Sequence, residues 1–120
     1  MKKILIVDDT LFIRETIKRM IDGHGFTVVA EADNGEDAVT LYRTHQPDVV
    51  TMDITMPIKN GLEATKEICQ EFPDAKIVII TAAGQQKNVI RALENGATDF
   101  MTKPFTAQKL LAMLQQHINV

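Results

Sequence analysis

The sequence contains a single cysteine, Cys69, so no disulfide can form within the chain. The spacing of Cys69 from neighbouring apolar positions is that of the inner face of a helix: Leu62, Thr65, Ile68 and Phe72. This pattern predicts a buried structural thiol.

Basic residues are not in excess, because 13 Lys and Arg stand against 16 Asp and Glu, for a net charge of -3. The chain therefore has no global basic field that would attract nucleic acid or an anionic membrane. We expect neither as a partner.

Long apolar runs are also missing. The N-terminal stretch MKKILIVDD has four apolar residues between two lysines and two acids, which is far too few for a signal peptide or a membrane span. We expect a cytoplasmic protein.

The composition is that of a folded domain. The 120 residues are 45% hydrophobic and 24% charged, which is close to average usage in soluble domains and sufficient for a core. No linker or low-complexity tract interrupts the chain, so residues 1–120 are expected to form a single domain.

Short apolar runs alternate with segments of helical periodicity. The runs predict strands at residues 4–7, 27–32, 49–52, 77–80 and 99–103. Asn and Gly punctuate the helical segments, at Gly23 and Gly25, Asn34 and Gly35, Asn60 and Gly61, and Asn95 and Gly96. The alternation predicts an α/β fold, a (βα)5 flavodoxin-like doubly wound sandwich with a parallel sheet of order 2-1-3-4-5.

Polar residues stand where the predicted strands end. Asp8 and Asp9 follow the first strand, Asp53 the third, Thr81 ends the fourth, and Lys103 ends the fifth. Each alone could cap a helix or fix a turn. Together they meet at the switch point of the sheet, where like charges about 4 Å apart repel by roughly 4 kcal/mol at an effective dielectric constant of about 20. The cluster therefore requires a positive partner.

Magnesium is the cation that suits this cluster. Carboxylates, a backbone carbonyl and retained waters match its octahedral preference, whereas softer metals lack ligands because the three histidines are scattered. With Mg²⁺ and Lys103 present, three negative charges face three positive ones. Such a pocket can accept a phosphoryl group, for which Asp53 is the best-placed nucleophile.

Five motifs in this order resemble one known family: ILIVDD, DITMP with Asp53, IITA with Thr81, GATDF with Phe100, and KPF from Lys103. The chain resembles the receiver domain of two-component response regulators, and most closely the stand-alone chemotaxis regulators of the CheY type. The resemblance covers essentially the whole chain.

The resemblance implies that Asp53 is the phosphoacceptor. Asp9 and Asp53 would ligate Mg²⁺ together with the backbone carbonyl of Thr55, and Asp8 would assist through water.

The resemblance also implies the switch. Lys103 would pair with the phosphoryl group, Thr81 would hydrogen-bond it, and Phe100 would change rotamer in concert. These changes would act on the face formed by the fourth helix, the fifth strand and the fifth helix. The Lys103-Pro104 peptide bond would be cis.

Two features depart from the more usual pattern. Phe100 lacks the hydroxyl group of a tyrosine, so we expect it to favour burial more than a tyrosine would. Thr55 and Ala83, which flank the phosphoryl site, are uncharged, and the lifetime of the phosphorylated form stays open.

The implied function is a switch that is phosphorylated by a sensor histidine kinase (CheA-like) and binds a flagellar motor switch protein, with a phosphatase as a further partner. A phosphorelay intermediate and an isolated receiver of a larger transcription regulator are the alternatives. Lys87, Asn88 and Arg91 could dock a partner or form a solvated helix face.

Two other classes fit less well. Aspartyl-phosphate phosphatases of the haloacid dehalogenase type carry a second Asp two residues after the nucleophile, where this chain has Thr55. A flavodoxin-like cofactor carrier would bring phosphate against Asp8 and Asp9. We therefore expect a signalling protein that assists its own phosphorylation and dephosphorylation, not a turnover enzyme.

Overall fold

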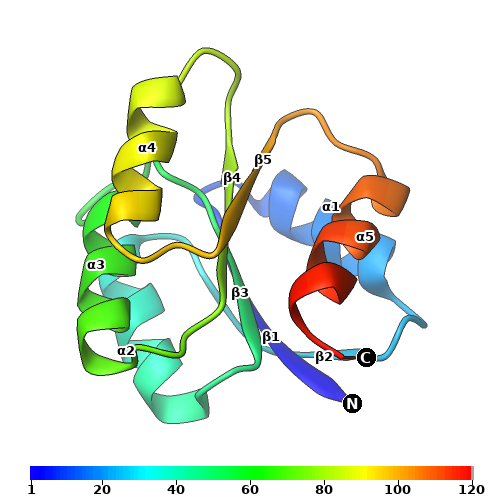
Figure 1. Ribbon diagram of the computed structural model, residues 1–120. Coiled ribbons are helices and arrows are strands. Elements are labelled where there is room, and N and C mark those ends of the chain that lie inside the picture. The colour runs from blue at the N-terminus through cyan, green and yellow to red at the C-terminus, as the bar shows by residue number, and fades with distance from the viewer. Residues whose placement is uncertain (120) are drawn as a thin grey trace.

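The computed structural model describes residues 1–119, in which five strands and five helices alternate along the chain (Figure 1). The strands are β1 (Lys2–Val7), β2 (Phe26–Ala32), β3 (Val49–Met52), β4 (Ile77–Thr81) and β5 (Asp99–Thr102). The helices are α1 (Leu11–Ile21), α2 (Gly35–His45), α3 (Gly61–Glu71), α4 (Gln86–Glu94) and α5 (Ala107–His117).

All neighbouring strands pair in parallel, in the order β2-β1-β3-β4-β5. Helices cover both faces of the sheet, with α1 and α5 on one side and α2, α3 and α4 on the other (Figure 1). The predicted fold and strand order are confirmed.

Each face of the sheet has its own apolar core. On β1, Ile4 and Ile6 belong to the core under α1 and α5, whereas Leu5 and Val7 belong to the core under α2 and α3. All four side chains are buried. A strand covered on both faces is apolar at most positions, which is why the runs in the sequence do not alternate regularly with polar residues.

Asparagines begin two helices as predicted. The Asn34 side chain accepts a hydrogen bond from the Asp37 backbone, and Asn60 forms a capping box with Glu63. The α4 helix ends at Glu94, immediately before Asn95 and Gly96.

The buried thiol predicted for Cys69 is only half-buried. Cys69 lies at the edge of the core beside Gly96, and its Sγ atom donates to the Gly96 carbonyl over 3.5 Å. Burial raises the pKa of this thiol.

Among residues 1–119, no helix combines the length and the apolar character needed to cross a membrane.

Candidate functional site

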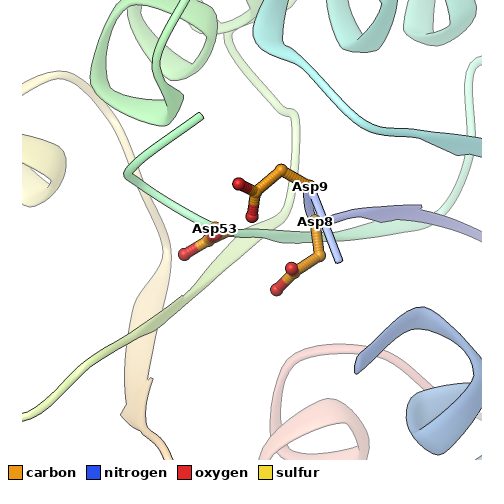
Figure 2. Close-up of side chains that lie close together, drawn as sticks. All are labelled: Asp8, Asp9 and Asp53. Atoms are coloured by element: carbon orange, nitrogen blue, oxygen red, sulfur yellow. The ribbon is translucent and has the colours of Figure 1, made fainter. Parts of the chain in front are cut away.

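The carboxyl ends of β1 and β3 bring three aspartates together. Asp8 and Asp9 follow β1, and Asp53 follows β3, its neighbour in the sheet (Figure 2). One carboxylate oxygen from each side chain lies within 4.8 Å of those of the other two. The predicted convergence of these residues is therefore present in the structure.

Sheet-like backbone hydrogen bonding continues for one residue beyond the ends of β1 and β3. The Asp8 amide donates to the Ala32 carbonyl and the Asp53 amide donates to the Val7 carbonyl, each over 3.0 Å. The aspartates thus start from rigid backbone, although their side chains lie beyond the last strand residue.

The start of α3 holds the loop after Asp53 from the other side. The Gly61 amide donates to the Ile54 carbonyl over 2.7 Å. A Cβ atom at Gly61 would lie 1.9 Å from the Asp53 carbonyl oxygen, so only glycine allows this approach.

The three carboxylates differ in their surroundings. Asp8 is 1% exposed and Asp53 is 7% exposed, whereas Asp9 is exposed. Asp8 Oδ1 accepts hydrogen bonds from the amide and the hydroxyl of Thr10, over 2.9 and 2.8 Å. Lys103 Nζ lies 3.0 Å from Asp8 Oδ2 and 3.6 Å from Asp53 Oδ1. One ammonium thus contacts two of the three carboxylates.

Burial and the neighbouring charges both affect the pKa of Asp53. Burial, with the neighbouring Asp8 carboxylate, raises the pKa of Asp53 from 3.8 to about 6, although Lys103 and the Ile54 amide act in the opposite direction. Negative charge at Asp53 is therefore only partly compensated by the protein.

The residues present fit a hard divalent cation. The clustered side chains offer only oxygen ligands, and the raised pKa of Asp53 shows that additional positive charge would stabilise the carboxylate form. Oxygen ligands in an incomplete shell suit Mg²⁺, which retains several waters. Thr55 lies in the same loop, two residues after Asp53, with its side chain exposed.

Thr81 links the site to α4. Its buried hydroxyl donates to Gln85 Oε1 over 3.3 Å, and Asn88 of α4 donates to the same oxygen over 3.3 Å. The sequence did not predict this role of Gln85, because a glutamine at the start of a helix has no distinguishing pattern.

Lys103 is placed by β4. Its amide donates to the Thr81 carbonyl over 2.8 Å, and the Lys103-Pro104 peptide bond is cis. The ion pair with Asp8 holds the Lys103 ammonium beside the aspartates.

Phe100 is 40% exposed, and the expectation that it favours burial more than a tyrosine would stays a prediction. Phe100 lies on β5, an edge strand, where it lines a hollow of about 490 Å³ together with Val89, Ile90 and Leu93 of α4. An edge strand covers its side chains on fewer sides than a central one, so a phenylalanine here remains partly in solvent.

The residues considered for docking lie on α4. Lys87 and Arg91 are exposed and Asn88 is half-buried. A role for these three residues in binding a partner stays a prediction.

Comparison with known proteins gives a consistent result. The sequence model described as the response regulator receiver domain matches residues 4–115. The chain is 50% identical over 117 residues to the chemotaxis protein CheY of Bacillus subtilis, covering 98% of each. It is 47% identical over 115 residues to CheY of Thermotoga maritima, covering 96% of each.

A solved structure is similar in backbone as well. The crystal structure of the CheX-CheY-BeF3-Mg+2 complex from Borrelia burgdorferi contains a chain that matches with a TM-score of 0.91 and 32% identity, covering 96% of this chain and 87% of that one.

Proposed function

The chain belongs to the response regulator receiver family, and we propose that it is a phosphorylation-activated switch in which Asp53 accepts the phosphoryl group. The observation that carries this proposal is the buried Asp53 carboxylate with a raised pKa, surrounded by Asp8, Asp9 and Lys103. These are the parts that a phosphoacceptor requires: a nucleophile, a place for a cation, and an ammonium for the incoming charge.

The Asp53 carboxylate has one constrained and one available oxygen. Oδ1 accepts a hydrogen bond from the Ile54 amide over 2.9 Å, and within residues 1–119 no hydrogen bond to Oδ2 is formed. We assign attack on phosphorus to Oδ2. With phosphohistidine as donor, a new P–O bond forms, the P–N bond breaks, and its electron pair returns to the histidine nitrogen.

The surrounding residues would interact with the negative charge of the phosphoryl group. Lys103 is close enough to pair with a phosphoryl oxygen, and the Thr81 hydroxyl could exchange Gln85 for the same group. When bound to Asp9, Asp53 and the Thr55 carbonyl, with Asp8 acting through water, Mg²⁺ supplies charge neutralisation for the transferred group.

If the Thr81 hydroxyl no longer donated its hydrogen bond to Gln85, the start of α4 would be affected, because Gln85 Oε1 also accepts a hydrogen bond from Asn88. The face formed by α4, β5 and α5, which includes the exposed Phe100, would then change its affinity for a partner. We propose a sensor histidine kinase of the CheA type as the donor and a flagellar motor switch protein as the output partner, with a phosphatase as a third partner. The similarity to chemotaxis proteins supports this assignment over a phosphorelay intermediate or a receiver of a transcription regulator.

Phosphorylation is tested by incubating the protein with Mg²⁺ and acetyl phosphate and mapping the acyl phosphate by mass spectrometry. Asp53→Asn should incorporate none, whereas Asp74→Asn, an exposed control, should match the parent. Equal incorporation by Asp53→Asn would overturn the assignment.

Output is tested by capturing partners with the beryllofluoride-treated protein. A motor switch component supports the chemotaxis proposal. A histidine phosphotransfer protein in its place would favour the phosphorelay alternative.

A further inference from the structure

Arg14 of α1 reaches back to the turn that carries the acidic pair. Its Nη1 atom donates to the Asp8 backbone carbonyl over 2.7 Å, and its Nε atom donates to Glu31 Oε1 over 3.0 Å. The side chain is 15% exposed. Because the guanidinium is planar and is held at two points, its orientation is fixed.

Glu31 can meet Arg14 only because β2 contains a bulge. The pairing with β1 shifts by one residue between Ile4 and Leu5, so that Ile4 faces Val28 but Leu5 faces Ala30. A shift of one residue exchanges the two faces of a strand.

The packing of β2 shows this exchange. Phe26 and Val28 pack in the core under α1 and α5, whereas Ala30 and Ala32 pack in the opposite core. Glu31 therefore points to the α1 side, where an unbulged strand would place it under α2. Bulges recur beside functional sites, where they redirect a side chain.

Glu31 is itself held in its charged form. Its Oε2 atom lies 2.8 Å from Lys18 Nζ, and Lys18 also pairs with Glu15 over 2.7 Å. The hydrogen bond from Lys18 lowers the pKa of Glu31. Lys18 has no hydrogen bond to Asp8 or Asp9 within residues 1–119, so it shares the network without contacting the site.

We propose that Arg14, anchored by Glu31, is a positioning residue for cation binding by the Asp8-Asp9 turn. The carbonyl that it holds belongs to the peptide between Asp8 and Asp9. Because a peptide is planar, fixing that oxygen fixes the plane from which the exposed Asp9 side chain projects. The inference rests on the proposed function in one respect, namely that Asp9 is a Mg²⁺ ligand.

The test is the Mg²⁺ dissociation constant, measured by isothermal titration calorimetry without any phosphodonor. Arg14→Met should weaken binding about tenfold, the usual effect of losing a group that orients a metal ligand. Arg14→Lys keeps the charge but has no planar fork, and it should lie within about threefold of Arg14→Met. Lys18→Met also removes one positive charge that pairs with Glu31, and it should change the Mg²⁺ dissociation constant by less than about twofold.

A second readout separates positioning from a general loss of structure. With acetyl phosphate, Arg14→Met should require about tenfold more Mg²⁺ for half-maximal phosphorylation, while its rate at saturating Mg²⁺ stays within about twofold of the parent. Circular dichroism checks folding. If Arg14→Met does not fold, Glu31→Gln, which weakens the anchor alone, should raise the dissociation constant about threefold.

A parent-like Mg²⁺ dissociation constant for Arg14→Met or Arg14→Lys would overturn the proposal. Equal weakening of Mg²⁺ binding by Arg14→Met and Lys18→Met would also overturn it, because the effect would then come from charge alone. These outcomes leave phosphorylation of Asp53 untouched. Conversely, a parent protein that binds Mg²⁺ but takes no phosphate would refute the proposed function while the effect of Arg14 on binding is still measured.

Discussion

Lys103 Nζ lies 3.0 Å from Asp8 Oδ2 and 3.6 Å from Asp53 Oδ1. Only the Asp8 contact is a hydrogen bond. Asp8 therefore holds the Lys103 ammonium, and Asp53 has the weaker contact with it. A phosphoryl group on Asp53 would offer Lys103 a more negative partner.

Removing this ammonium should destabilise the protein. Lys103→Met leaves Asp8, which is 1% exposed, without its charged partner. We expect the free energy of unfolding, measured with urea in EDTA, to fall by about 1–3 kcal/mol. Lys109→Met, an exposed lysine on α5, should have almost no effect. Equal losses in the two variants would show that the contact with Asp8 contributes nothing.

Replacing Asp53 should stabilise the protein in a pH-dependent manner. The pKa of Asp53 is about 6 when folded, against an ordinary value of 3.8. The folded state thus binds this proton more tightly than the unfolded state, and the resulting stability is lost as the pH rises from about 4 through about 6.

Asp53→Asn should therefore exceed the parent in stability by on the order of 2 kcal/mol above about pH 7, and by least near about pH 4. Denaturation series in EDTA at several pH values measure the difference. Added Mg²⁺ should narrow it, because the parent binds the cation better. A difference that is constant with pH would contradict the assigned pKa.

Ile58 is strained by its backbone. It has a φ of 68°, a conformation that β-branched residues rarely adopt, and its side chain is 76% exposed, so little packing compensates. Ile58→Asn should raise the free energy of unfolding by about 1 kcal/mol, since asparagine tolerates this region. Ile58→Val keeps the branched Cβ and should bring no gain. A stabilised valine variant would rule out strain as the cause.

Gly61 should tolerate no side chain. In Gly61→Ala the new Cβ would meet the Asp53 carbonyl oxygen, so the loop must move and phosphorylation should slow by about tenfold or more. Gly23→Ala is the control, because a Cβ there meets no atom within 4 Å although its φ of 76° is also positive. It should lose stability but keep the parent rate. Parent-like phosphorylation by Gly61→Ala would show that the loop has room to adjust.

The order of the strands and the place of the site could be predicted because both follow from alternation. Parallel strands put their carboxyl ends at one edge of the sheet. The strand order therefore placed Asp8 beside Asp53, on the neighbouring strands β1 and β3, and put Lys103 at the same edge. The helix caps at Asn34 and Asn60 could also be predicted from the sequence, because an asparagine before a helical run has a local hydrogen-bonding role.

The features that the sequence did not reveal depend on single-residue details of tertiary structure. The stretch FTVVAEA has no sign of a bulge, yet the bulge decides on which face Glu31 lies. Arg14 carries the same pattern as any charged residue of an amphipathic helix. The exposure of Phe100 follows from the neighbours that an edge strand lacks, which residue type alone does not reveal.

The ion pair between Lys103 and Asp8 joins residues 95 positions apart in the chain. A ribosome-bound chain that ends before β5 contains β1, β3 and the aspartates that follow them, but it lacks Lys103. This ion pair can therefore form only after β5 has been synthesised and has paired with β4.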